Sequence, residues 1–246
     1  MNLNFYGTRG VCPTSEQMVS LVLETSTDML LIDAGSFTIF HNDRIIEETS
    51  SILISHNHHD HIALLPHFVL ARFHRSKSIG KDLPNCKVVS PEPLTFLMNS
   101  MGLEEDTDYE YYNYIPDNFA DPNLSIALIQ TKHPVINYGY KISDGQRNLV
   151  YTGDTGYFSD LIEFCHKTDL VICEASYSDK NREKAEKWGH MTPAMVAKLI
   201  NEADLSNVIL THFVELEPKE FVSQVKNQIK QSTNVIAAYT GMEISI

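Results

Sequence analysis

Four metal-ligating side chains fall within six residues, directly after a β-rich segment. The sequence from residue 55 to 61 reads Ser-His-Asn-His-His-Asp-His, which places His56, His58, Asp60 and His61 together. Chance is a poor explanation, because the chain of 246 residues holds only eleven histidines. Imidazole nitrogens and carboxylate oxygens bind Zn²⁺, Mn²⁺ and iron, and these side chains converge only if the backbone makes a tight loop. The segment therefore predicts a metal site at the end of a strand.

Three further candidate ligands also lie at the ends of expected strands. His133, Asp154 and His212 follow the expected strands at residues 124–130, 148–151 and 208–210. Active-site residues of α/β folds are found at such positions. Taken singly, each has an ordinary explanation: a buried hydrogen-bonded histidine, a helix N-cap or a strand-end hydrogen bond. Together with the first four, they predict a site for two divalent metal ions.

The order of expected elements predicts an α/β sandwich, in which helices cover two packed sheets. Strands are expected at residues 3–6, 20–24, 29–32, 51–54, 88–89, 124–130, 138–142, 148–151, 170–173, 208–210 and 235–238. Helices are expected at residues 62–73, 91–101, 158–166, 193–203 and 219–231. The first three strands suggest a meander at one sheet edge. Because the candidate ligands come from both halves of the chain, we expect one domain spanning residues 1–246.

Charge and cysteine usage limit the compartment and the partners. The net charge of −13 argues against an extended grip on nucleic acid, which needs a basic face to displace phosphate counterions. The cysteines are far apart and form no C-x-x-C pair, as expected of reduced thiols in the cytoplasm. They are Cys12, Cys86, Cys165 and Cys173. No apolar stretch approaches the length of a membrane span, so we expect a cytoplasmic protein without membrane contact.

The seven candidate ligands, in this order, resemble the five-motif signature of the metallo-β-lactamase fold superfamily. The resemblance includes Gly-Thr-Arg-Gly at residues 7–10 and Pro13. It implies a four-layer αββα sandwich with a two-metal site between the sheets, holding zinc in the first instance, with manganese or iron as alternatives. It implies one metal ion on His56, His58 and His133, a second on Asp60, His61 and His212, and Asp154 bridging both.

Two segments resemble the branch that contains ribonuclease Z and phosphodiesterases. Asp154 stands where members that hydrolyse β-lactams use a cysteine or no bridging carboxylate, so a β-lactamase is not expected. Residues 188–193, Trp-Gly-His-Met-Thr-Pro, and Glu174 in Cys-Glu-Ala-Ser match elements of the branch. The resemblance implies that His190 contacts a phosphate oxygen and protonates the leaving oxygen. The ordinary alternative makes His190 a residue at a helix start, with Thr192 as its cap.

The chain also departs from ribonuclease Z. That enzyme carries a long tRNA-clasping arm between its third and fourth motifs, whereas here only a short segment separates His133 from Asp154. The remaining resemblance is to compact phosphodiesterases, such as the cyclic-phosphate phosphodiesterase of phosphonate breakdown and relatives that act on cyclic nucleotides. The cysteine-rich zinc site of some of these has no counterpart here. The expected substrate is a small phosphodiester, and a homodimer is compatible with the sequence.

These residues suggest a mechanism as a hypothesis. Two metal ions would share a hydroxide that attacks the phosphorus, Asp60 would orient that hydroxide, and His190 would protonate the leaving alkoxide. The catalytic residues would therefore be Asp60 and His190. A lactonase or thioesterase would use the same ligands without needing His190. An RNA-processing nuclease and a non-catalytic metal or ligand sensor are further alternatives.

Two segments have no assigned role. Tyr109, Tyr111, Tyr112 and Tyr114 could line a pocket or cover a sheet edge. A basic run, composed of Arg72, Arg75, Lys77 and Lys81, could hold a further phosphate or form a solvated helix end.

Overall fold

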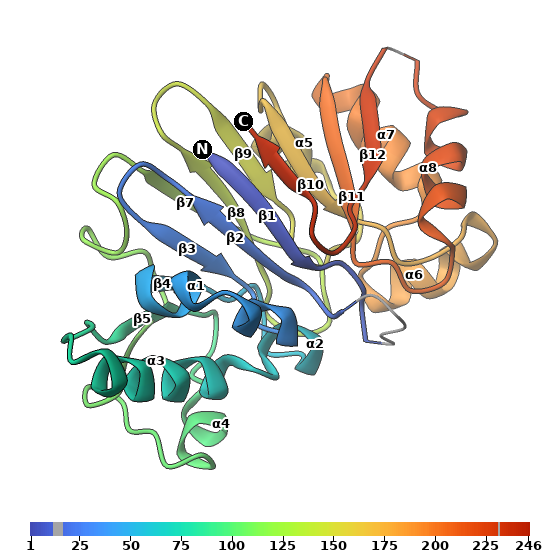
Figure 1. Ribbon diagram of the computed structural model, residues 1–246. Helices are drawn as coiled ribbons and strands as arrows, with labels where there is room; N and C mark the ends of the chain where they lie inside the picture. The colour runs from blue at the N-terminus through green and yellow to red at the C-terminus, as the bar shows by residue number, and fades with distance from the viewer. Residues whose placement is uncertain (12–16, 231) are drawn as a thin grey trace.

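Two mixed β-sheets pack face to face in the computed structural model (Figure 1), which describes residues 1–11, 17–230 and 232–246. Cys12 and Pro13 lie outside the described residues. The first sheet has the strand order β13-β1-β2-β3-β4-β5-β6 and the second has the order β12-β11-β10-β9-β8-β7. Strands β3 to β6 run parallel to one another, as do β9 to β12.

The strands of the first sheet are β1 (Asn2–Gly7), β2 (Ser20–Glu24), β3 (Met29–Ile32), β4 (Thr49–Leu53), β5 (Cys86–Val89), β6 (Tyr109–Tyr112) and β13 (Glu243–Ser245). Those of the second are β7 (Ser125–Gln130), β8 (Tyr138–Ser143), β9 (Asn148–Tyr151), β10 (Leu170–Glu174), β11 (Asn207–Thr211) and β12 (Asn234–Ala237).

Helices cover the outer face of each sheet (Figure 1). Over the first sheet lie η1 (Phe37–His41), α1 (Asp43–Glu48), α3 (Leu65–Ile79) and α4 (Thr95–Asn99), and α2 (His59–Ile62) precedes α3. The second half contains α5 (Ser159–Cys165), η2 (Asp179–Asn181), α6 (Arg182–Trp188), α7 (Pro193–Ala203) and α8 (Pro218–Lys226). Of these, α5, α7 and α8 pack on the second sheet.

Strand β10 shows how the sequence specifies four layers. Leu170 and Ile172 point between the two sheets, while Val171 and Cys173 point toward α7 and α8. Successive side chains of a strand face opposite sides, so a strand covered on both faces is apolar throughout. Separate apolar clusters lie under the first helical layer, between the sheets and under the second helical layer. The expected four-layer αββα sandwich is therefore confirmed.

The structure corrects three local expectations. Strands β1 to β3 form the expected antiparallel meander, but β13 pairs with β1 and takes the edge position. The helix expected at 91–101 is shorter and forms only α4. The helix expected at 62–73 is observed as α3, which begins at Leu65 and is followed by Gly80 in the left-handed conformation. In the tyrosine-rich segment, Tyr109, Tyr111 and Tyr112 belong to β6, which is the edge strand of the first sheet.

The basic run is engaged by protein groups. Arg72 is buried and donates to the carbonyl oxygens of Ile46 at 2.6 Å and Pro84 at 2.9 Å. Arg75 forms an ion pair with Glu47 at 2.6 Å. These contacts disfavour a phosphate site at Arg72 and Arg75, and the buried Arg72 is not part of a solvated helix end.

Among the described residues, no helix combines the length and apolar character that crossing a membrane requires.

Candidate metal centre

The histidine-rich loop is held by backbone contacts that depend on a glycine. The Ala34 N–H donates to the His61 carbonyl at 2.6 Å, and the Leu64 N–H donates to the Ala34 carbonyl at 2.8 Å. A Cβ atom at the neighbouring Gly35 would lie 1.9 Å from the Asp60 carbonyl oxygen. Only glycine therefore allows the segment after β3 to approach the single turn of α2, which carries Asp60 and His61.

We expect Gly35→Ala to destabilise the protein by about 1–3 kcal/mol or more, because the new methyl group must displace backbone. The measurement is urea unfolding of the variant beside Gly145→Ala. Gly145, unlike Gly35, has a positive φ, and its Cβ would meet nothing within 4 Å, so Gly145→Ala reports a backbone penalty without any steric clash. Equal losses from both substitutions would contradict the close approach.

A first cluster, defined as His56, His58 and His133 with Asp154, gathers candidate ligands from three loops. All four ligating atoms lie within 4.8 Å of one another. His58 Nδ1 lies 2.8 Å from His56 Nε2 and 3.2 Å from His133 Nε2. Asp154 Oδ2 is 3.8 Å from His56 Nε2. The sandwich thus brings together residues separated by almost a hundred positions.

A second cluster, defined as Asp60, His61 and His212, lies beside the first. Asp60 Oδ2 is 3.1 Å from His212 Nε2 and 3.6 Å from His61 Nε2. Asp154 also faces this cluster, with Oδ1 at 3.5 Å from His61 Nε2 and Oδ2 at 3.2 Å from His212 Nε2. Asp154 is therefore the carboxylate that both clusters share, as the bridging arrangement requires.

The donor atoms fit divalent cations. His61 Nε2 and Asp154 Oδ1 are buried and have no hydrogen-bond partner among the described residues. Buried polar atoms normally have a hydrogen-bond partner. Imidazoles and carboxylates that converge without such a partner are typical of a metal site. Burial and the neighbouring His61 hold the pKa of His56 well below its usual range, which keeps its lone pair available.

In three of the candidate ligands, the ring nitrogen that points away from the clusters has an acceptor, which fixes the ring orientation. The pairs are His61 Nδ1 with Asp33 Oδ2 at 2.7 Å, His133 Nδ1 with the Gly189 carbonyl at 3.1 Å and His212 Nδ1 with Ser176 Oγ at 2.9 Å. Asp33 and Ser176 were not singled out from the sequence. Asp33 carries the same signal as the ligands, a polar residue directly after a buried strand, in Leu-Leu-Ile-Asp-Ala-Gly.

Two residues at the centre adopt the left-handed backbone conformation although neither is glycine. Asp33 and His212 both have φ of 57°. This conformation costs about 1–2 kcal/mol for an ordinary L-residue. The surrounding contacts must therefore compensate, and the strain lies where side chains are aimed at the clusters.

His190 lies at the margin of the clusters with a buried carboxylate behind it. Its Nδ1 is 2.7 Å from Glu174 Oε1, and its ligating atom lies within 4.8 Å of those of Asp154 and His212. Burial lowers the pKa of His190, but the Glu174 carboxylate outweighs this and raises it to about 9. Helix α7 begins at Pro193 as expected, yet Thr192 makes no side-chain capping bond. The geometry thus favours a role at the site over a role at the helix start.

Fold and site together define a metallo-hydrolase. A family model described as a β-lactamase superfamily domain matches residues 28–213, so the chain belongs to that superfamily. The probable metallo-hydrolase YhfI of Bacillus subtilis is 29% identical over 229 residues, covering 86% of each chain.

Three solved structures illustrate how widely this fold is shared. The YhfI crystal structure has a TM-score of 0.85 at 24% identity, covering 99% of this chain and 98% of that one. Human short-form tRNase Z has a TM-score of 0.77 at 21% identity, covering 100% and 99%. A diphosphatase of the PhnP family has a TM-score of 0.73 at 14% identity, covering 99% and 96%. These likenesses show the fold.

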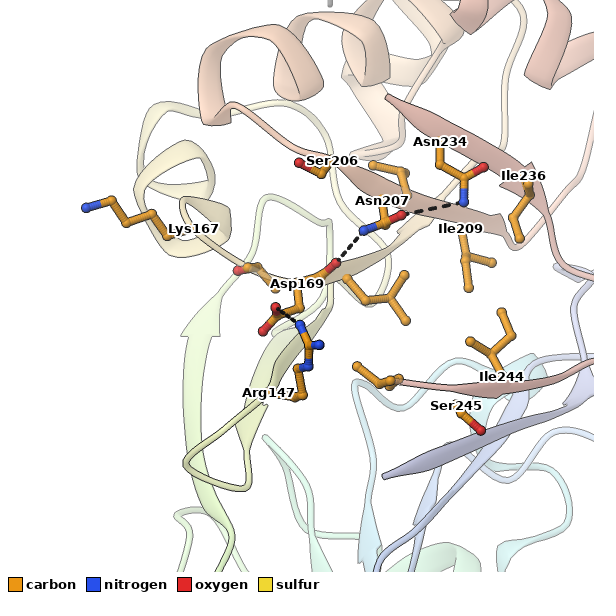
Figure 2. Close-up of a pocket in the computed structure, with 14 residues that line it drawn as sticks. Arg147, Lys167, Asp169, Ser206, Asn207, Ile209, Asn234, Ile236, Ile244 and Ser245 are labelled. Carbon is orange, nitrogen blue, oxygen red and sulfur yellow. Dashed lines mark hydrogen bonds and ion pairs between the residues drawn. The ribbon is translucent and has the colours of Figure 1, made fainter. Parts of the chain in front are cut away.

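A cavity of about 480 Å³ opens at the other ends of the parallel strands (Figure 2). It is lined by the first residues of β10 to β12 and by β13, and Arg147 pairs with Asp169 at its margin at 3.0 Å. The candidate ligands follow the last residues of the strands. This cavity is therefore separate from the metal centre.

Proposed function

We propose that the protein is a metal-dependent phosphodiesterase that acts on a small phosphodiester of cyclic or nucleotide-like character. The observation that carries the proposal is the pair formed by His190 and Glu174 beside the two clusters. A proton donor at this position suits a reaction that expels an alkoxide, which is a poor leaving group until it is protonated. Hydrolysis of a thioester by the same ligands has no need of it, because a thiolate departs without a proton.

Each group at the site has a separate role in the proposed reaction. Divalent metal ions, zinc in our proposal, would supply a nucleophile at neutral pH and withdraw charge from a phosphoryl oxygen. Asp60 contributes one oxygen to the second cluster and orients the attacking water with the other. His190 donates its Nε2 proton to the leaving oxygen, while Glu174 accepts from Nδ1 and stabilises the charged ring.

A small substrate is supported by charge and by the length of one connection. The net charge of −13 disfavours a long polyanion on the surface. Between His133 and Asp154 the chain forms the β8–β9 hairpin, and the segment holds no arm that could clasp an RNA. The proteins that share the fold include a tRNase Z and a diphosphatase of the PhnP family, which supports a substrate that contains phosphate. We infer that residues 1–246 act as one unit.

The test is a substrate panel on one Zn²⁺- or Mn²⁺-loaded sample. It contains 3′,5′- and 2′,3′-cyclic nucleotides, bis-(4-nitrophenyl) phosphate, a lactone and a thioester. We expect kcat/KM to be highest for a phosphodiester. A lactone or thioester as the best substrate would overturn the assignment, and a precursor tRNA cleaved better than any small phosphodiester would overturn the substrate class.

A further inference from the structure

The cavity of Figure 2 lies where the edges of the two sheets leave the interior of the sandwich open. Strand β12 is an edge of the second sheet, and β13 is an edge of the first. Ile236, Ile244 and Ile246 line the cavity and belong to the apolar cluster between the sheets, yet each is partly exposed. The buried Leu170 and Ile209 also line it. Aliphatic surface from both sheets therefore meets solvent in one concave site of about 480 Å³.

One margin of this cavity is polar and offers hydrogen-bond donors. Figure 2 shows the Arg147 guanidinium beside Asp169, across the cavity from Ile236 and Ile244. Arg147 Nη1 donates to Asp169 Oδ1 at 3.0 Å, and Asp169 Oδ2 accepts the Asn148 N–H at 2.9 Å. Both carboxylate oxygens thus have a donor, whereas the guanidinium has several N–H groups and the described residues engage only Nη1. The unused hydrogen-bonding capacity at this margin is that of a cation.

The side chains that line the cavity restrict the class of ligand. None of the described lining residues is aromatic, so the cavity offers no surface on which a nucleobase would stack. Its one acidic side chain, Asp169, is already paired, which disfavours a cationic ligand. Lys167 points away from the cavity in Figure 2, so Arg147 is the cation available to a bound molecule among the described lining residues. These features suit a molecule with an aliphatic body and one anionic end.

We propose that this cavity binds an aliphatic monocarboxylate, with its hydrocarbon chain between the two sheets and its carboxylate on Arg147. A guanidinium matches the geometry of a carboxylate and binds it through parallel hydrogen bonds. Small-molecule sites have volumes of about 300–1,000 Å³, and this cavity lies in the lower half of that range, which favours a chain of medium length. The site is separate from the metal centre, and the inference does not depend on the proposed phosphodiesterase activity.

The experiment measures binding to the Zn²⁺-loaded protein by titration calorimetry, with butanoate, hexanoate, octanoate and the uncharged octan-1-ol as probes. We expect affinity to rise about fourfold for each added methylene, because each one leaves water for apolar surface. Octan-1-ol should bind about tenfold or more weakly than octanoate, because it lacks the charge that Arg147 recognises. Failure of octanoate to show saturable binding would overturn the proposal.

Methyl NMR spectra locate the bound probe. Octanoate should shift the resonances of Ile209, Ile236 and Ile244, which line the cavity. It should leave those of Ile54 and Ile62, which flank the histidine-rich loop, unchanged. Shifts confined to Ile54 and Ile62 would mean that the carboxylate binds at the metal centre, and they would overturn the proposal.

Arg147→Gln tests the anionic end of the ligand. We expect it to weaken octanoate binding by about tenfold or more and to leave octan-1-ol binding unchanged. The matched control is Arg182→Gln, which removes another exposed arginine from a carboxylate pair, with Glu186 at 2.9 Å, on α6. This control should bind both probes as the wild type does. Equal octanoate affinity in Arg147→Gln and the wild type, or octan-1-ol binding as tight as octanoate binding, would contradict a carboxylate site.

Discussion

Asp154→Asn is expected to abolish binding of the two proposed metal ions and to lower the proposed phosphodiesterase activity by more than 100-fold, because loss of an outer partner alone costs up to about 100-fold. The substitution keeps the shape of the side chain but removes the charge that faces both clusters. Asp154 is buried, and its two oxygens lie 3.2 to 3.8 Å from nitrogens of His56, His61 and His212. The measurements are metal content per chain after dialysis and kcat/KM on the best substrate.

Thermal unfolding separates this effect from misfolding. A cation that binds only the folded state raises the unfolding temperature by mass action, so the wild type should gain stability when Zn²⁺ is added. The variant should keep a cooperative transition and lose most of that gain. Asp82→Asn, which neutralises an exposed carboxylate, is the control and should behave as the wild type. Two tightly bound ions in Asp154→Asn would contradict the shared carboxylate.

The metal centre was largely predictable because its signals are local. His56 to His61 lie in one loop, and His133, Asp154 and His212 each follow a strand with a recognisable apolar pattern. Parallel strands end at the same edge of a sheet, so polar residues in those positions converge without any knowledge of tertiary contacts. The layers were predictable for a related reason, because buried strands and amphipathic helices have different patterns of apolar residues in the sequence.

The supporting contacts could not be predicted, because their partners are distant in sequence. A single carboxylate after a strand, as at Asp33, is equally typical of a turn, and only its contact with His61, 28 positions later, gives it a role. Strand β13 has only three residues, and it is recognisable as a strand because it pairs with β1, from the other end of the chain. Such short segments carry too little periodicity to be recognised alone.

His190→Ala should distinguish proton donation from simple structural support by its dependence on the leaving group. We expect kcat/KM for a cyclic nucleotide to fall by about 10²- to 10⁴-fold, the usual contribution of a positioned acid. Hydrolysis of bis-(4-nitrophenyl) phosphate should fall much less, because nitrophenolate departs without a proton. His67→Ala, which removes an exposed histidine of α3, is the matched control and should leave both rates unchanged.

The pH dependence gives an independent check with a defined sign. An acid must be protonated to act, so wild-type activity on a cyclic nucleotide should fall as the pH rises through the pKa of His190, which the Glu174 carboxylate raises above its usual range. The variant has no such group, and its residual activity should lack this alkaline decline. Equal losses on both substrates, with the decline retained, would mean that His190 supports the site structurally, and the leaving oxygen would then need another proton donor.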